Sequence, residues 1–389
     1  MRAERPYNGS EHRTDTGVLY FRGPGAAFLG RDDGWTKKAA DYRERTGQTN
    51  GMRKEVNMSL EVRNLTKKYG EKTVVDGLSF TLETPGVYAL LGTNGAGKTT
   101  SIRMILGMLA CDGGQVLWQG KPLDAMHMNV GYLAEERGLY PKYELMDQLL
   151  YFAKLKGVPK ETAKERIAYW AGRLEVEEYL YPAKTKGKKA EKPKLADQLS
   201  KGNQQKIQLM AALLSEPELL ILDEPLSGLD PVNTDLFKGI IREEMEKGKY
   251  LIMSSHQMAT IEEFCEDITI LNRGRTVLQG NLNEIKRSYG RVNMFVKCDQ
   301  PFEDIIGRHA LPVINDTPDG TQLKVTGETQ ALDFLQDLLK ERRQVVKFEL
   351  REPSLHEIFI EKAEAAQEEE KSGAAGRRME ENGGSHEEK

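Results

Sequence analysis

The stretch Gly92-Thr93-Asn94-Gly95-Ala96-Gly97-Lys98-Thr99 decides the fold, because it carries a complete GxxxxGK[ST] pattern between two regular segments. The apolar run Val87 to Leu91 before it predicts a buried strand. The residues after it predict a helix with one apolar stripe, formed by Ile102, Ile105, Leu106 and Leu109. Glycines at this spacing let backbone N–H groups turn inward around phosphate oxygens, and the helix N-terminus adds a favourable dipole. We therefore predict that this segment binds nucleotide phosphates, with Lys98 at the β- and γ-phosphates and the Thr99 hydroxyl on Mg²⁺. The predicted phosphate-binding residues are Gly92, Thr93, Asn94, Gly95, Ala96, Gly97, Lys98, Thr99 and Thr100.

Two further strand signals end in groups that suit the same chemistry. The run Leu219 to Leu222 is followed by Asp223, which can hold Mg²⁺ through water, and by Glu224, which can accept a proton from an attacking water. A third strand, from Tyr250, is followed by His256. A lone histidine is more often structural, but ligands in a doubly wound sheet bind at the carboxyl ends of the strands. We therefore predict that Lys98, Glu224 and His256 form the catalytic group.

Periodicity divides the 389 residues into four parts. Residues 1–57 lack a sustained period and are expected to be disordered, and the abrupt onset of pattern at Met58 suggests a native start there, with a genuine disordered tail as the alternative. Residues 58–287 alternate strands and helices, with a helical insertion at about 136–200. Residues 288–362 follow the order βαββαβ, which is the ferredoxin-like arrangement, and 363–389 are expected to form a disordered acidic tail.

Composition narrows the class of protein. The net charge of −4, from 56 basic and 60 acidic residues, provides no basic footprint for nucleic acid. No apolar run reaches the roughly 18 residues that a membrane span needs, and the first residues lack a secretory signal. Three scattered cysteines, Cys111, Cys265 and Cys298, fit a reducing compartment. We expect a cytoplasmic protein that reaches a membrane only through a partner.

The order of motifs resembles that of an ABC ATPase over residues 58 to about 285. After the GxxxxGK[ST] segment (Walker A) come Leu199-Ser200-Lys201-Gly202-Asn203, the acidic strand (Walker B), Ser227-Gly228-Leu229-Asp230 and His256. The segments GYLAEERGLYPK, LSKGNQQKIQ and EPSLHEIFIEK are similar to those of bacterial ABC-2-type exporter ATPases of the sodium-efflux kind. The resemblance implies a P-loop ABC ATPase cassette of α/β class with a helical insertion, plus a small C-terminal α+β (ferredoxin-like) domain.

The resemblance also assigns roles that spacing alone does not. It places Tyr69, which we expect in the loop after the first strand, against adenine. It also places Ser200 and Gly202 at a helix N-terminus that faces the γ-phosphate held by a second subunit. Asp230 would then lie at the seam of the homodimer. Glu135 stands where a Mg²⁺-contacting Gln is usual, so the expected metal ligands are Thr99, Glu135 and Asp223. The signature also departs from the usual LSGGQ, with Lys201 and Asn203 at its third and fifth places.

The expected cofactors are ATP and Mg²⁺, and the expected partners are separately encoded transmembrane permease subunits. The protein would lie on the inner face of the cell membrane, with Tyr140, Pro141 and Tyr143 as candidates for contacting those subunits. One alternative is a soluble ABC ATPase acting on nucleic acid or the ribosome, but such proteins usually carry two cassettes or a long coiled coil. Another is a nucleotide-sensing scaffold, against which the retained general base argues.

Overall fold

The structure, a computed structural model, describes residues 60–125, 128–136, 138–181, 193–263 and 265–364. The expected disordered segment 1–57 lies outside the described residues, and so does the expected tail from residue 365 onward. No helix of the described residues is long and apolar enough to cross a membrane.

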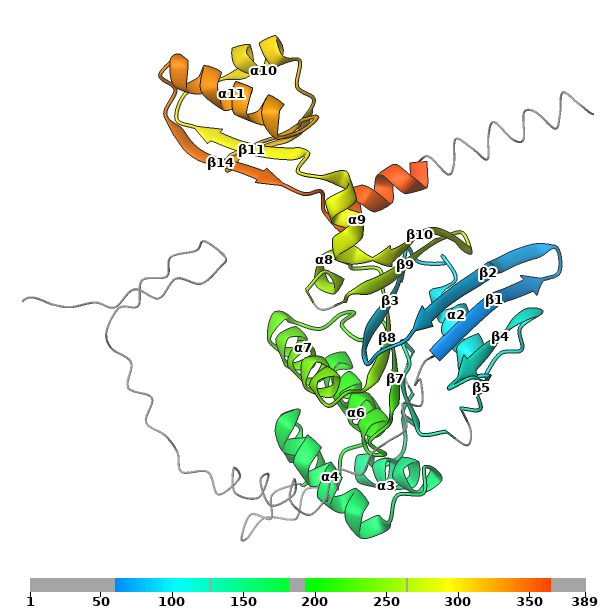
Figure 1. Cartoon of the computed structure of the whole chain (residues 1–389). Helices are drawn as coiled ribbons and strands as arrows, with labels where there is room; N and C mark the ends of the chain where they lie inside the picture. Colours follow the sequence, from blue (N-terminus) through cyan, green and yellow to red (C-terminus); the bar gives the residue numbers. More distant parts are fainter. Residues whose placement is uncertain (1–59, 126–127, 137, 182–192, 264, 365–389) are drawn as a thin grey trace, which may run out of the picture. The chain divides into compact units, whose positions relative to one another are not determined.

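Among the described residues, six strands form the sheet that carries the phosphate-binding segment, in the order β10-β9-β3-β8-β7-β6 (Figure 1). Strand β10 pairs antiparallel to β9, and the other neighbours are parallel. The central strands are almost wholly buried, as expected of parallel strands covered on both faces. The strands are β3 (Gly86–Gly92), β6 (Val130–Leu133), β7 (Leu219–Asp223), β8 (Tyr250–Ser255), β9 (Asp267–Asn272) and β10 (Arg275–Asn281).

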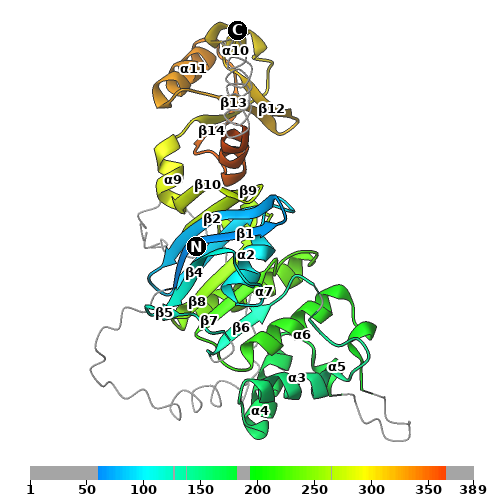
Figure 2. The ribbon, with the colours of Figure 1, turned by 90° about the vertical axis from the view of Figure 1, so that its right-hand side faces the viewer.

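A second, antiparallel sheet has the order β2-β1-β4-β5, and its first three strands lie side by side in Figure 2. Its apolar side chains share one core with helix α2 (Lys98–Ile105) and with residues of β3 and β8. Its strands are β1 (Leu60–Tyr69), β2 (Lys72–Leu82), β4 (Gly113–Trp118) and β5 (Lys121–Pro122). Tyr69 is therefore the last residue of β1 rather than a loop residue. Helix α2 ends before Leu109 because Gly107 adopts a left-handed φ of 67°.

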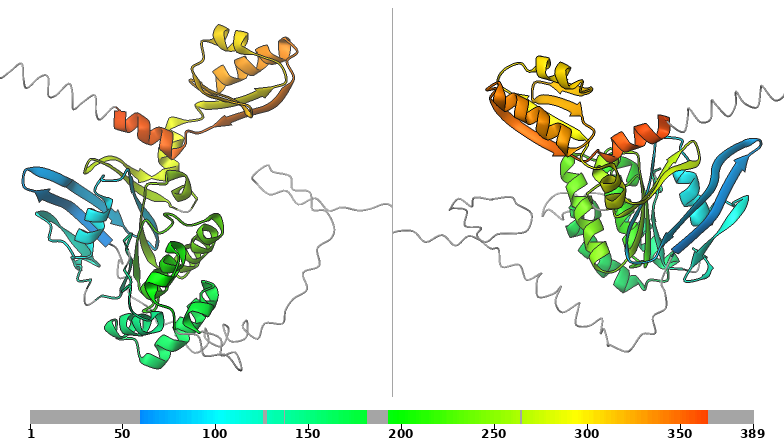
Figure 3. Two further views of the ribbon diagram at one scale, coloured as in Figure 1. Left: turned by 180° about the vertical axis from the view of Figure 1, so that it is seen from behind. Right: turned by 45° about the horizontal axis from the view of Figure 1, so that its top comes forward.

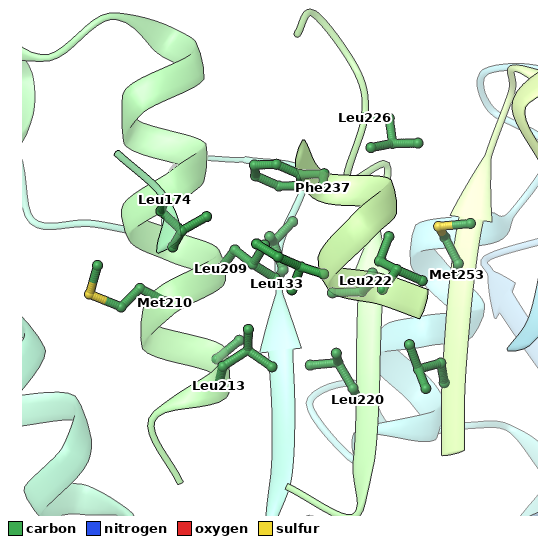
Figure 4. Close-up of a cluster of buried hydrophobic side chains, with 14 of the residues drawn as sticks. Leu133, Leu174, Leu209, Met210, Leu213, Leu220, Leu222, Leu226, Phe237 and Met253 are labelled. Carbon is green, nitrogen blue, oxygen red and sulfur yellow. The ribbon is translucent and has the colours of Figure 1, made fainter. Parts of the chain in front are cut away.

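The helical insertion is confirmed. Within the described residues, no strand interrupts the chain between β6 and β7, and the elements are α3 (Leu145–Leu155), α4 (Lys160–Arg173), α5 (Glu177–Leu180), η1 (Ala196–Gln198) and α6 (Lys201–Leu213). Helix α7 (Pro231–Glu246) follows β7. Leu209 and Leu213 of α6 point toward β6, which carries Leu133 (Figure 4). This packing fixes α6, and hence its N-terminus, relative to the ends of the parallel strands.

The C-terminal elements follow the expected order βαββαβ and form an antiparallel sheet in the order β12-β13-β11-β14. Helices α10 and α11 cover one face of this sheet (Figure 3) and enclose a separate core that includes Met294 and Phe334. In chain order these elements are β11 (Asn293–Cys298), α10 (Glu303–His309), β12 (Val313–Thr317), β13 (Gly320–Lys324), α11 (Glu328–Lys340) and β14 (Val345–Arg351). Two helices precede them, α8 (Met258–Ile261) before β9 and α9 (Leu282–Tyr289) after β10.

A helical segment, 355–364, follows β14 and returns to the larger core. Its start carries a reciprocal cap, since the Ser354 N–H donates to Glu357 Oε2 at 2.7 Å and the Glu357 N–H donates to Ser354 Oγ at 3.2 Å. Leu355 and Phe359 belong to the core of the large sheet. The EPSLHEIFIEK segment therefore begins the helix that ties the last described residues to the cassette.

Candidate active site

The phosphate-binding segment joins the end of β3 to the start of α2, as predicted. Gly97 is the N-cap of α2 with a φ of 107°, and Gly92 ends β3 with a φ of 148°. A Cβ at Gly92 would lie 2.3 Å from Leu271 O, and one at Gly97 would lie 2.9 Å from Val74 O. Both positions thus require glycine for conformational and for steric reasons. The loop is held against neighbouring backbone, which leaves the α2 N-terminus free to face an anion.

Lys98 is buried at the centre of the site. Its Nζ donates to Gly92 O at 2.9 Å and to Thr93 O at 3.3 Å. The same nitrogen lies 3.1 Å from Glu224 Oε1, and the two side chains are only 6% and 4% exposed. A buried ion pair of this kind is costly to break from one side alone, because the remaining charge would lack a partner. The phosphate loop and the acidic end of β7 are therefore joined electrostatically.

Glu224 also contacts the third predicted catalytic residue. Its Oε2 lies 2.8 Å from His256 Nδ1, so the carboxylate stands between the ammonium of Lys98 and the imidazole. Glu224 has a φ of 51°, in the left-handed region that residues with a Cβ rarely adopt. Such backbone outliers cluster at functional sites. The structure thus brings Lys98, Glu224 and His256 together at the carboxyl ends of β3, β7 and β8.

The predicted metal ligands supply oxygen donors. Asp223 is fully buried, and Ser254 Oγ donates to its Oδ1 at 2.5 Å. Burial raises the pKa of Asp223, hydrogen bonds from Ser254 and Thr99 oppose that rise, and the negative charge of Glu135 adds to it. Carboxylate and hydroxyl oxygens are the ligands that Mg²⁺ prefers, and a cation would offset the charge crowded here. The donor set of Thr99, Glu135 and Asp223 therefore fits Mg²⁺. Sequence reasoning assigned no role to Ser254, although its place at the end of β8 could have indicated one.

Ser200 and Gly202 lie at the start of α6. Ser200 is the N-cap of α6, accepting from the Asn203 N–H at 3.3 Å. Among the described residues, no hydrogen bond or ion pair joins Ser200 or Gly202 to Lys98, Glu224 or His256. Asp230, the N-cap of α7, accepts from Asn233 N at 3.0 Å, and a Cβ at Gly202 would lie 3.8 Å from Asn233 Nδ2. Ser200, Gly202 and Asp230 thus belong to the adjacent starts of two helices.

The remaining predicted contacts lie at the surface. Tyr69 is 55% exposed at the end of β1, with Lys67 Nζ 5.6 Å from its ring centroid. Its ring is therefore available to a flat ligand. Glu135 follows β6 and is also exposed. Its charge still acts on Asp223, which places it within electrostatic reach of the buried end of β7.

Two family models match the chain. One, described as ABC transporter, covers residues 75–227, and the other, described as the C-terminal domain of DrrA1-3-like ATP-binding proteins, covers residues 280–363. The first match includes the segment around Lys98 and Glu224. The second includes the separate antiparallel sheet and residues 355–363 of the last helical segment.

Individual ABC transporter ATP-binding proteins are also similar to this chain in sequence and structure. An uncharacterized ABC transporter ATP-binding protein of Bacillus subtilis, YhaQ, is 43% identical over 310 residues, covering 79% of this chain and 100% of the relative. The linearmycin resistance ATP-binding protein LnrL of the same species is 28% identical over 313 residues, covering 77% and 97%. The Nod factor export ATP-binding protein I of Ralstonia nicotianae is 34% identical over 230 residues, covering 58% and 68%. A solved structure of an ATP-binding subunit of an ABC transporter has a TM-score of 0.52 at 28% identity, covering 59% of this chain and 92% of that one.

Proposed function

This chain belongs to the ABC transporter ATP-binding proteins, and from that premise we propose that two copies of it close on two MgATP to drive separately encoded membrane subunits. As a member of this family it binds and hydrolyses ATP. The observation that carries the proposal is the buried contact of Glu224 with both Lys98 and His256. In this geometry, phosphate binding at Lys98 would release the Glu224 carboxylate from its ion pair, and the same carboxylate could then accept a proton from the attacking water.

The proposed chemistry begins with an exchange of partners. Phosphate oxygens of ATP would take over Lys98, which pairs with Glu224 at 3.1 Å. Glu224 would then accept a proton from water, while His256, 2.8 Å away, orients the carboxylate. Thr99, Asp223 and Glu135 would hold Mg²⁺, which neutralises charge on the β- and γ-phosphates when bound. Tyr69 would stack on adenine. Support for these roles comes from the positions of Lys98, Glu224 and His256 at the carboxyl ends of β3, β7 and β8.

The partner chain would complete each site. Within the part of the chain that the structure describes, no hydrogen bond or ion pair joins Ser200 or Gly202, at the α6 N-terminus, to the chain's own Lys98 cluster, and helix N-termini are ready-made anion sites. We assign the α6 N-terminus to the γ-phosphate held by the other copy, with Asp230 at the seam. Lys201 of the LSKGN variant would add positive charge to that contact.

Nucleotide binding should depend on Mg²⁺, because Thr99, Glu135 and Asp223 place two carboxylates close to where the triphosphate would lie. Without the cation, their charges would repel the phosphates. Titration of the purified chain with ATP should give an affinity at least about tenfold lower in excess EDTA than in excess Mg²⁺. Equal affinity in the two conditions would contradict this ligand set.

We also propose that the chain lies on the inner face of the cell membrane and serves an exporter. Relatives named for Nod factor export and for linearmycin resistance support export, and none of the relatives described above is named for nucleic acid. Sodium or a small toxic compound as cargo rests on sequence resemblance alone, and the membrane subunits would select it. We propose 58–287 as the cassette and 288–362 as an accessory domain, with support from the family match at 280–363.

The surface proposed to receive the membrane subunit is the loop before α3. The side chain of Gln148 is buried, and its Oε1 accepts from Tyr140 N at 2.8 Å while its Nε2 donates to Tyr143 O at 2.9 Å. This holds the loop while the rings of Tyr140 and Tyr143 remain 50% and 63% exposed. Rigid exposed tyrosines are typical anchors of protein interfaces.

Tyr143→Ala should therefore lower co-purification of the membrane subunit by about tenfold or more, since interface tyrosines often contribute 2 kcal/mol or more. The ATPase rate of the isolated chain should stay at the wild-type value. Tyr169→Ala, which removes an exposed tyrosine from α4, is the matched control and should co-purify normally. Normal co-purification of Tyr143→Ala would remove this loop from the interface.

A further inference from the structure

The backbone at Glu224 is held from two sides in its left-handed conformation, with a φ of 51°. On one side, the Glu224 N–H donates to Ser254 Oγ at 2.9 Å, and Ser254 belongs to β8 of the same sheet. On the other side, Gln205 Nε2 donates to Pro225 O at 2.6 Å and to Glu224 O at 3.4 Å. A backbone conformation that is rare for glutamate persists when its surroundings determine it in this way.

Gln205 is a buried residue of α6, with its amide directed at the end of β7. Its orientation follows from its partners, because two carbonyl oxygens require the N–H end of the amide. Its Oε1 is buried without a hydrogen-bond partner among the described residues. A buried acceptor without a partner costs free energy, so the two hydrogen bonds to carbonyl oxygens must offset that cost.

The same helix begins at Ser200, one and a half turns before Gln205. Helix α6 is a continuous element, so a displacement of its N-terminus also displaces Gln205. The Gln205 amide is bonded to the peptide that carries the Glu224 side chain. Helix α6 and the Gln205 amide therefore connect Ser200, which we assign to the γ-phosphate bound by the other copy, with Glu224, which acts on the chain's own nucleotide.

We propose that Gln205 is a positioning residue for Glu224, and that through it ATP at one site of the dimer sets the general base of the other site. This inference rests on the proposed function, since it requires the two-chain site and Glu224 as base. It couples the two sites, because each base is held through Gln205 by the helix α6 that would engage the nucleotide of the other site.

The test compares Gln205→Met with Gln208→Met in the full-length chain. Methionine keeps the length of the side chain but lacks the N–H donors. Gln208 lies in the same helix, and its Nε2 is 3.8 Å from the position that a Cβ at Gly138 would take. Gln205→Met should lower kcat by about 10- to 100-fold, as a small misplacement of a catalytic group does, and leave the KM for ATP nearly unchanged. Coupled sites predict a sigmoidal dependence of the wild-type rate on ATP concentration, and Gln205→Met should make this dependence hyperbolic. Gln208→Met should retain both the wild-type rate and the sigmoidal dependence.

A double-mutant comparison shows whether Gln205 acts through Glu224. In single-turnover hydrolysis, Gln205→Met should add no further loss to Glu224→Gln, whereas independent effects would multiply. A wild-type rate for Gln205→Met, or a multiplied loss in the double variant, would overturn the proposal. If Gln205→Met melts below the assay temperature, Gln205→Leu replaces it, since leucine is uncharged, is smaller and also lacks the donor. A wild-type rate for Glu224→Gln would instead refute the proposed function.

Discussion

The variant Glu224→Gln is expected to hydrolyse ATP about 10²- to 10⁴-fold more slowly than the wild type, the usual effect of losing a general base. An amide cannot accept the proton that the carboxylate takes from water. The substitution is nearly isosteric, so the glycine-rich loop and Lys98 should still bind the phosphates. Hydrolysis should therefore be lost while ATP binding is retained.

The same variant should accumulate as a closed, ATP-bound dimer. The carboxylate of Glu224 is buried beside Lys98, and replacing it removes a negative charge from the region that receives the triphosphate. Less repulsion favours closure of two chains on two nucleotides. Size-exclusion chromatography in MgATP, with phosphate release measured in parallel, tests both parts. An inactive variant that stays monomeric would keep the base assignment but argue against the two-chain site.

The variant Ser200→Arg should abolish hydrolysis and leave ATP binding to the isolated chain nearly intact. Ser200 caps α6 by accepting from the Asn203 N–H, and among the described residues no hydrogen bond joins it to Lys98 or Glu224 of its own chain. Arginine would remove the cap, at a cost of about 1 kcal/mol, and would fill the space proposed for the partner's γ-phosphate. Binding is measured at protein concentrations where the chain is monomeric, and turnover at concentrations where it pairs.

Two further variants separate the effect of losing the helix cap from the effect of the bulk of arginine. Ser200→Thr retains the capping hydroxyl and should retain most activity, whereas Ser200→Ala removes the cap without the bulk and should lie between the two. A loss of ATP binding by Ser200→Arg in proportion to its loss of activity would mean that Ser200 belongs to its own chain's site.

Much of this architecture was predictable from local patterns. The strands that end at Gly92, Asp223 and Ser255 follow from continuous apolar runs. The βαββαβ order after residue 288 was also correct, because its turns and helical stripes are local signals. Tyr69 was misplaced because β1 continues up to a two-residue turn, Gly70-Glu71, across which Tyr69 pairs with Lys72 of β2.

The supports of the site could not be predicted in the same way. Ser254 and Gln205 act through bonds that connect β8 and α6 to β7, between residues 20 or more positions apart. The direct contact of Lys98 with Glu224 depends likewise on the order of strands in the sheet. Motif order indicates which residues meet a nucleotide, whereas the residues that hold them in place are determined by packing.

The two-chain site is tested most directly by mixing two inactive chains, Ser200→Arg and Glu224→Gln. In a mixed dimer, the intact Lys98 and Glu224 of the first chain face the intact Ser200 of the second, so one complete site forms. Single-turnover hydrolysis of bound ATP should therefore be faster in the mixture than in either chain alone. It should stay below the wild-type rate, because α6 of the first chain carries Ser200→Arg and no longer engages the second nucleotide. A mixture that hydrolyses no more than the average of its two components would contradict the claim that each nucleotide is cleaved between two copies of this chain.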